Sequence, residues 1–201
     1  MSMSISYELT GRTGQKARTR EALVAAAREL LAQGVTPTVE AAAESASISR
    51  ATAYRYFPNQ GALVAAAYPR LEAPSLLDDD APREPEARLD LVVRRITASL
   101  LENEAAMRAA LRLALDPAAG EERPLLRRGR AIGWIDDALS PLAGRLSPRH
   151  RRRLVLAIRA AVGIEPFVWL TDVAGLSREE AAESMRWSAG ALLRAALAEA
   201  A

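Results

Sequence analysis

The chain has 201 residues, no cysteine, a single histidine and a formal net charge of +2. A chain of this length can bury a sizeable core in one globular unit or two small ones. The lack of cysteine excludes disulfides and thiolate sites, and one histidine, His150, excludes a multi-histidine metal centre. The first residues lack the apolar run of a secretory leader, and no uninterrupted apolar run reaches the roughly 20 residues of a membrane helix. We therefore expect a cytoplasmic protein without a membrane partner.

A basic segment lies near the N-terminus. The segment Arg12–Arg20 contains four basic residues, which form either a solvated tail or an arm that contacts DNA phosphates or the minor groove. A helix is expected to follow as far as Gln33, because leucine and alanine recur there at helical spacing and Gly34 supplies a C-terminal stop. This helix should support the elements after it without contacting DNA.

The stretch Thr38–Leu63 has the layout of a helix-turn-helix. Two short helical patterns flank a tight break, and the second pattern is rich in aromatic and arginine residues. Ser49 can cap the second helix with its hydroxyl, and Pro58 ends it, because a proline disfavours helical geometry in the residue before it. The second helix, Ser49–Phe57, is then suited to lie in the major groove of DNA.

A helical wheel divides this second helix into two faces. Ala53 and Phe57 lie on one side, where Phe57 can anchor the helix to a core. The opposite side carries small, hydroxyl and guanidinium groups, which suit a groove because they reach phosphates and guanine edges and let the backbone approach closely. The members of this outward side are Ala51, Thr52, Tyr54 and Arg55.

This stretch resembles the helix-turn-helix of the TetR/AcrR family of transcriptional regulators. The residues that match its signature are Thr38, Val39, Ala43, Ala46, Ile48, Ser49, Thr52, Tyr54, Phe57, Pro58 and Leu63. Three positions depart: Ser47 replaces the usual turn glycine, Gln60 replaces a lysine that meets a phosphate, and Ala42 replaces a larger aliphatic residue. These departures imply a strained turn, one phosphate contact fewer and looser packing. The resemblance covers residues 18–70, and beyond residue 75 only the helix layout and length are similar.

The wheel and the resemblance together give the candidate DNA-binding residues. They are Thr38, Arg50, Ala51, Thr52, Tyr54, Arg55, Tyr56 and Gln60. The charge distribution agrees, because residues 12–70 contain eight basic and four acidic residues, whereas residues 71–201 contain 19 arginines and 20 acids. A basic excess in the part with the groove-binding helix is the pattern expected of a DNA-binding region.

The segment 72–85 contains three prolines and an acidic triplet and is predicted to be a linker. A fourth N-terminal helix, capped by Asn59, should end just before it, near Leu71. The region after the linker is helical in pattern, without a strand signal, and its expected helices are 86–101, 104–115, 125–142, 147–171 and 177–198. The expected fold class is therefore all-α, with a helix-turn-helix domain at 1–71 and a helical effector-binding and dimerisation domain at 86–201.

The last two predicted helices carry more apolar surface than one face needs. In the TetR/AcrR family the last two long helices of each subunit form a four-helix bundle about a two-fold axis, and two half-sites on DNA require two recognition helices. The last helix has small residues on one side, so we expect Ala189 and Gly190 near the closest crossing of a homodimer.

The resemblance also implies a pocket for a small effector among the C-terminal helices. Glu165 follows the apolar stripe of its helix, so its carboxylate must be paired, protonated or lining a cavity, and Pro166 should kink the helix beside it. The basic run Arg149–Arg153 is a solvated face or, alternatively, a contact for an anionic ligand or for DNA. Large apolar residues belong to the core by default but complete the candidate pocket: Met107, Leu111, Trp134, Glu165, Phe167 and Trp169.

The sequence thus favours a ligand-responsive, homodimeric DNA-binding regulator, most simply a repressor that binds a palindromic operator. Its response would be a population shift, in which the ligand favours a spacing of the two recognition helices that no longer fits successive major grooves. Two alternatives stay open: a DNA-binding regulator without a ligand, and a helical small-molecule-binding protein. No nucleophile elbow, phosphate-binding loop, dinucleotide fingerprint or metal-ligand spacing is present, so we expect no enzyme, no cofactor and no metal.

Overall fold

The structure, a computed structural model, describes residues 4–67, 73–115 and 129–200, with side chains from residue 14 onward. Within these ranges the chain is helical, without a β-strand, and the predicted all-α class is confirmed. The helices are α1 (Ser4–Ala32), α2 (Val39–Ser45), α3 (Arg50–Tyr56), α4 (Gln60–Ala67), α5 (Pro85–Glu102), α6 (Glu104–Leu115), α7 (Arg130–Ala138), α8 (Pro148–Ala161), α9 (Ile164–Val168) and α10 (Arg178–Glu199). A 3₁₀ turn, η1 (Ser140–Leu142), and a π-helical turn, η2 (Trp169–Val173), complete the described elements.

The chain divides into two compact units. Unit 1 contains α1 to α4 and, from Ala105 on, α6, whereas unit 2 contains α5 and α7 to α10. The chain therefore leaves unit 1, builds α5 of unit 2, and returns to unit 1 for α6. The division at residues 71 and 86 remains a prediction about functional domains, because these compact units are defined by packing and place α6 with the N-terminal helices.

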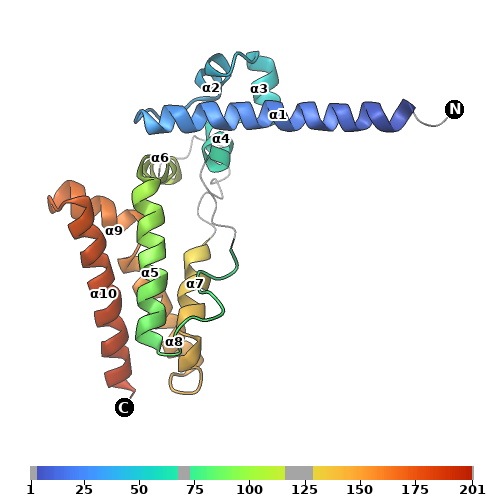
Figure 1. The fold of residues 1–201 in the computed structure, drawn as a ribbon. Coiled ribbons are helices and arrows are strands. Elements are labelled where there is room, and N and C mark those ends of the chain that lie inside the picture. Colours follow the sequence, from blue (N-terminus) through green and yellow to red (C-terminus); the bar gives the residue numbers. More distant parts are fainter. Residues whose placement is uncertain (1–3, 68–72, 116–128, 201) are drawn as a thin grey trace. The chain divides into compact units, whose positions relative to one another are not determined.

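Unit 1 is built on the long helix α1 (Figure 1). Both α2 and α4 pack on α1, and α3 packs on α2. The core is made of small and aliphatic side chains around one aromatic ring, Phe57, and α6 adds Ala106, Ala109 and Ala110 to it. Two side-chain hydrogen bonds secure the ends of the helices: Arg28 Nε donates to Ala67 O at 3.0 Å, and Arg112 Nη2 donates to Thr36 Oγ1 at 2.6 Å. Short helices with few large side chains are thus held by one shared core.

Unit 2 is a bundle in which α10 packs on α5 and α8, and α7 packs on α5 and α8 (Figure 1). Phe167 is its largest fully buried side chain. The aliphatic core around it comes from four helices and includes Leu89, Val93, Ile135, Ile158, Met185 and Leu193. The bounds of α5 and α6 agree within one residue with the predicted 86–101 and 104–115, because proline, acidic first-turn residues and the apolar stripe all give the same limits.

The predicted single helix 147–171 is wrong, because the chain breaks between α8 and α9. Gly163 has φ 145° and ψ −170°, a conformation that favours glycine, and the break comes before Pro166 instead of at it. Pro166 then lies in the first turn of α9, where no intrahelical hydrogen bond needs its missing N–H. Arg159 stabilises the break, since its Nη1 donates to Val162 O at 2.9 Å.

The predicted helix 125–142 also ends early, at Ala138, while its residues 125–128 lie outside the described ranges. Pro141 cannot donate to the carbonyl four residues before it, so the chain continues as the 3₁₀ turn η1. The carbonyls left free at this end are capped by Arg88 of α5, whose Nη2 donates to Asp137 O at 3.1 Å and whose Nε donates to Ala138 O at 3.2 Å.

Helix α10 packs the face predicted for a dimer contact against its own unit instead. Ala181, Met185, Ala189 and Leu193 are buried against other helices of the same unit. The prediction that Ala189 lies at a dimer crossing is therefore wrong. Trp187 is 69 % exposed and lies on the opposite side of the helix. The N-terminus of α10 agrees with its prediction: Ser177 and Glu180 form a capping box with hydrogen bonds of 3.1 and 2.8 Å.

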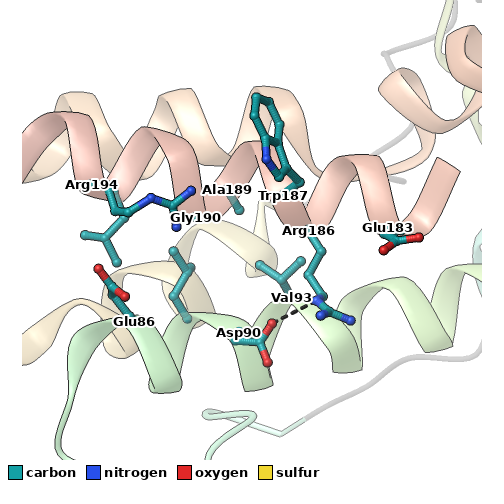
Figure 2. A pocket seen from close by; sticks show the side chains of 11 residues that line it. Glu86, Asp90, Val93, Glu183, Arg186, Trp187, Ala189, Gly190 and Arg194 are labelled. Carbon is teal, nitrogen blue, oxygen red and sulfur yellow. Dashed lines mark ion pairs between the residues drawn. The ribbon is translucent and has the colours of Figure 1, made fainter. Parts of the chain in front are cut away.

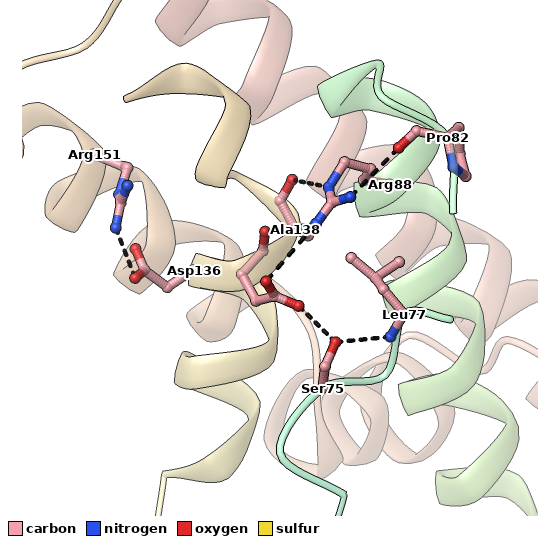
Figure 3. Close-up of polar contacts among 8 residues, drawn as sticks. Ser75, Leu77, Pro82, Arg88, Asp136, Ala138 and Arg151 are labelled. Atoms are coloured by element: carbon pink, nitrogen blue, oxygen red, sulfur yellow. Dashed lines mark hydrogen bonds and ion pairs between the residues drawn. The ribbon is translucent and has the colours of Figure 1, made fainter. Parts of the chain in front are cut away.

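The irregular segment 73–84 is held by unit 2 (Figure 3). Ser75 Oγ donates to Asp137 Oδ2 at 2.6 Å, and Arg88 Nη1 donates to Pro82 O at 3.4 Å. Arg95 donates to Leu76 O and pairs with Asp78, and this guanidinium holds the pKa of Asp78 below its ordinary value. The described part of the predicted linker is therefore fixed by side chains of α5 and α7.

The stretch Pro148–Val173 is long and apolar enough to cross a membrane by length and composition, with a mean hydropathy of 1.6 over its best window. Core helices of globular proteins meet the same criterion. In this stretch the helix is interrupted at Gly163, and Leu154, Ile158 and Phe167 are buried in unit 2. Its hydropathy is thus explained by core packing.

Candidate nucleic-acid interface

Two capped helices and one strained residue form the helix-turn-helix. Thr38 caps α2 by accepting a hydrogen bond from Ala41 N at 3.0 Å, and Ser49 caps α3 by accepting one from Thr52 N at 3.3 Å. Between them, Ser47 has φ 54°, and it is the one described non-glycine residue in the left-handed region. Because that region disfavours residues with a Cβ, the turn is strained, as the missing glycine predicts.

The recognition helix α3 is anchored by its inner face. Ala53 has no exposed surface, and Phe57, which follows the helix, is 3 % exposed in the core of unit 1. The guanidinium of Arg20 on α1 lies 5.5 Å from the centroid of the Phe57 ring. These contacts fix the rotation of α3 about its axis, and thereby decide which side chains point outward.

The outer face of α3 carries the residues that the sequence proposes for DNA. Arg50, Ala51 and Arg55 are exposed, Tyr54 is 37 % exposed, and Thr52 and Tyr56 are half-buried. Thr52 Oγ1 accepts from Ser49 Oγ at 2.9 Å, which leaves the Thr52 hydroxyl its own proton to donate. The Arg55 guanidinium lies 5.8 Å from the centroid of the Tyr56 ring, so it projects from the helix beside an aromatic surface. Guanidinium, hydroxyl and methyl groups thus share one accessible face.

Sequence reasoning missed Glu40, which lies in the first turn of α2 and binds two of the outer residues. Tyr54 Oη donates to Glu40 Oε1 at 2.5 Å, and Arg50 Nη2 lies 2.7 Å from the same oxygen. The hydrogen bond from Tyr54, together with a backbone hydrogen bond and the charge of Arg50, lowers the pKa of Glu40 below its ordinary value. The same hydrogen bond to the carboxylate raises the pKa of the Tyr54 hydroxyl. No periodicity connects these residues, so only the packing of α2 on α3 reveals the contact.

Residues at the start of α4 have structural contacts. Asn59 Oδ1 accepts from Ala62 N at 2.8 Å, which confirms its predicted cap. Gln60, a candidate for DNA contact, donates from Nε2 to Pro37 O at 3.0 Å and so ties α4 to the residue before the Thr38 cap. A role of Gln60 toward DNA remains a prediction.

The basic arm is part of α1. Lys16, Arg18 and Arg20 are exposed on this helix, while the side chain of Arg12 lies outside the described part. Each helical turn advances the chain by 5.4 Å, so these cations are spaced along a helix and do not belong to an extended tail. Contact between these side chains and DNA phosphates remains a prediction.

The structure distributes the candidate effector residues over both units. Met107 and Leu111 are half-buried on α6 of unit 1, whereas the other four belong to unit 2. There, Phe167 is fully buried, and Trp134 is 9 % exposed and donates from Nε1 to Ala73 O at 2.9 Å. These two rings fill the core of unit 2.

The remaining candidates, Glu165 and Trp169, lie at the surface of unit 2. Glu165 Oε2 lies 3.5 Å from Arg159 Nη2, so the carboxylate is paired, one of the three possibilities predicted for it. Trp169 begins the turn η2 and is 58 % exposed. Their part in effector binding stays a prediction.

Among the described residues of unit 2, a larger and a smaller groove are lined by none of these six side chains. The larger, of about 300 Å³, lies between α5 and α10 and contains Trp187, Arg194 and the ion pair of Arg186 with Asp90 at 2.9 Å (Figure 2). The smaller, of about 160 Å³, lies between α8 and α10 beside His150. Among the described residues, no group of histidine, aspartate or glutamate side chains could hold a metal ion.

Comparison with known proteins identifies the region that contains this interface. Residues 23–67 match the model of the family described as bacterial regulatory proteins, tetR family. The matched residues span the end of α1 and all of α2, α3 and α4. No curated protein matches the chain.

Proposed function

Because this chain is a DNA-binding helix-turn-helix transcriptional regulator of the TetR family, we propose that it acts as a homodimeric repressor whose operator binding is released by a small effector. In this role the protein would act in the cytoplasm and have two macromolecular partners, operator DNA and a second copy of itself. The observation that carries the proposal is the outer face of α3, which presents Arg50, Ala51 and Arg55 on a helix fixed by the buried Phe57.

The roles of the outer residues follow from their chemistry. Arg55 is exposed and stands opposite Ala53, so it can enter a major groove and donate to guanine O6 and N7. Ala51 lets the helix approach the base edges, and the Thr52 hydroxyl can donate to a phosphate. The other candidates, Thr38, Tyr54, Tyr56 and Gln60, border this face and would bind the sugar–phosphate backbone.

Exposed apolar side chains support the homodimer. Leu156 on α8 is 43 % exposed and Trp187 on α10 is 69 % exposed, and these two helices pack directly on each other. Large apolar side chains exposed on a protein surface mark interaction sites where they gather into a patch. A second copy is the occupant that fits best, because a palindromic operator requires two recognition helices related by a two-fold axis.

Effector binding draws its support from the family alone, and one observation favours a regulator without an effector. Trp134 and Phe167 fill the core of unit 2, and the carboxylate of Glu165 is paired with Arg159. Native mass spectrometry of the protein purified from its host separates the two cases. A mass increment that is lost on denaturation supports the effector-responsive repressor, whereas a bare dimer that still binds DNA supports the alternative.

Salt dependence tests the DNA-binding part. A labelled duplex that is long enough for two half-sites is titrated with protein at rising salt, and fluorescence anisotropy reports the affinity. We expect log Kobs to fall linearly with log salt, with a slope of about −0.9 for each phosphate neutralised, because Lys and Arg release condensed counterions. Affinity that does not change between low and moderate salt would contradict the assignment.

A further inference from the structure

One carboxylate at the interface receives hydrogen bonds from two DNA-facing side chains. Glu40, Arg50 and Tyr54 form this group, called here the Glu40 cluster. Oε1 of Glu40 lies 2.5 Å from Tyr54 Oη and 2.7 Å from Arg50 Nη2, and the Arg50 guanidinium lies 5.7 Å from the centroid of the Tyr54 ring. The carboxylate belongs to α2, whereas both donors belong to α3. The cluster therefore lies across the two helices of the motif, on its accessible side.

The chemistry of this oxygen resembles that of a DNA phosphate oxygen. Both are anionic acceptors that form short, charge-assisted hydrogen bonds with hydroxyl and guanidinium donors. A tyrosine hydroxyl has one proton, so Tyr54 cannot donate to Glu40 and to a phosphate at the same time. A guanidinium has five N–H groups, so Arg50 can keep the carboxylate and still bind a phosphate. Competition is therefore strict for Tyr54 and partial for Arg50.

We propose that Glu40 is an intramolecular substitute for a DNA phosphate, which occupies the Tyr54 hydroxyl and part of Arg50 and so weakens binding to the DNA backbone. The inference rests on the proposed DNA-binding function and adds to it a residue that sets the backbone affinity. Backbone binding is independent of sequence, so the carboxylate lowers non-specific binding most, while base contacts by Arg55 are left intact.

The structure argues against a purely structural role for this cluster. Arg50 is 72 % exposed and Glu40 39 % exposed at their side chains, and ion pairs with such exposure stabilise folded proteins little. The rotation of α3 is instead fixed by Ala53 and Phe57 in the core. Replacing Glu40 should therefore leave the fold intact, and its effect on DNA affinity can be measured directly.

The test compares two isosteric charge removals on α2. Glu40→Gln keeps the side-chain shape and weakens the acceptor, whereas Glu44→Gln removes the same charge from an exposed residue that has no side-chain ion pair or hydrogen bond among the described residues. Binding to a mixed-sequence duplex is followed across a salt series. We expect Glu40→Gln to bind about tenfold more tightly than Glu44→Gln at low salt, with a slope steeper by about one unit.

A Tyr54→Phe variant tests whether the gain in DNA affinity comes from the Tyr54 hydroxyl. In the Tyr54→Phe background, Glu40→Gln should gain distinctly less affinity for DNA, because this background lacks the hydroxyl that the substitution would free to bind a phosphate. The double-mutant cycle measures the coupling between the two residues. Equal affinities of Glu40→Gln and Glu44→Gln would overturn the inference. Weaker binding by Glu40→Gln would also overturn it, since the carboxylate would then present Tyr54 productively. If wild type and Glu44→Gln bind DNA normally, either result leaves the proposed function standing; if all folded variants fail to bind DNA, both fall.

A second measurement needs no DNA. The ultraviolet difference spectrum between wild type and Tyr54→Phe isolates the titration of the Tyr54 phenol. The hydrogen bond that Tyr54 donates to the Glu40 carboxylate raises the pKa of Tyr54, so Glu40→Gln should lower that pKa toward its ordinary value. A Tyr54 titration that does not respond to Glu40→Gln would show that the cluster does not exist in solution and would overturn the inference.

Discussion

Helices α3 and α10 each bury one face, but their exposed faces differ in chemistry. α3 buries Ala53 and exposes Arg50, Ala51 and Arg55, whereas α10 buries a stripe of every fourth residue and exposes Trp187. A polar, basic outer face is stable in water and suits the sugar–phosphate backbone. An indole that is 69 % exposed is costly in water and suits another protein surface. The inner faces of these helices hold each unit together, and the outer faces are suited to different partners.

The largest expected effect comes from the inner face of α10. Ala189→Arg should destabilise the protein by about 5 kcal/mol or more, because a guanidinium would be buried without a partner in a well-packed core. Chemical denaturation measures this loss. Ala195→Arg, on the exposed side of the same helix, is the control and should unfold at nearly the wild-type midpoint. A stably folded Ala189→Arg monomer would show that this face is exposed in solution and would remove the distinction between the two helices.

The inner face of α3 should give the next largest effect. Phe57→Ala should destabilise unit 1 by about 3–5 kcal/mol, because it opens a cavity where the ring is 3 % exposed. Circular dichroism during thermal unfolding measures the change. Small residues surround this ring, so the site can collapse only partly. Wild-type stability in Phe57→Ala would mean that some other contact fixes the rotation of α3.

The outer face of α10 should affect association without affecting folding. Trp187→Glu should weaken the proposed homodimer by about 2 kcal/mol or more, since truncated aromatic anchors at interfaces cost that much and two like charges would meet across the two-fold axis. Sedimentation velocity at several concentrations measures this change. Leu91→Glu, which places the same charge at a 37 % exposed position on α5, is the matched control. Equal dimer affinity of both variants would place the interface elsewhere.

The outer face of α3 should affect DNA binding in the same selective way. Arg55→Ala should weaken operator binding by about 1–3 kcal/mol if the guanidinium reads a base, and it should relax specificity at that position. Binding to operator and mixed-sequence duplexes separates base readout from phosphate contact. The thermal midpoint of Arg55→Ala should equal that of wild type, because the side chain is exposed. A lowered midpoint would place Arg55 in the fold instead of the interface.

The smallest effect is expected in the turn before α3. Ser47→Gly should stabilise unit 1 by about 0.5–1 kcal/mol, because φ 54° strains a serine, while the greater freedom of glycine in the unfolded chain offsets part of the gain. Urea denaturation resolves a change of this size. Ser45→Gly, at the last residue of α2, should instead be destabilising. If both substitutions destabilise the protein, the turn is not strained in solution.

Sequence reasoning predicts the parts of this molecule that depend on local signals. Caps at Ser49, Asn59 and Ser177 and the bounds of α5 and α6 are reproduced, because each depends on residues within one turn of the chain. The inner face of α3 is also predicted, since Phe57 falls on the same side of the helix as Ala53 and can anchor it to the core. The fold class follows from these helices and the absence of a strand pattern.

The errors have a common physical cause. The small-residue face of α10 is buried, but a periodic pattern does not show whether such a face packs on its own unit or on a second copy. The packing of α10 on α5 and α8 shows that Ala189 lies inward. The break at Gly163 is stabilised by the hydrogen bond from Arg159 to Val162 O. The kink predicted from Pro166 alone does not take this contact into account. The role of Glu40 likewise requires α2 and α3 to be placed together. Sequence patterns give helices, whereas their tertiary neighbours determine rotation and pairing.

The return of α6 to unit 1 has a consequence for exchanging domains between related regulators. Three alanines of α6, Ala106, Ala109 and Ala110, complete the core around Leu23 and Leu63. A chimera that joins residues 1–71 to a foreign C-terminal region would replace these alanines with side chains selected for another core. Recombination at a single joint therefore disrupts unit 1 even when the whole helix-turn-helix is transferred. A functional chimera needs α6 to be transferred with α1 to α4, so that the complete packing unit is inherited together.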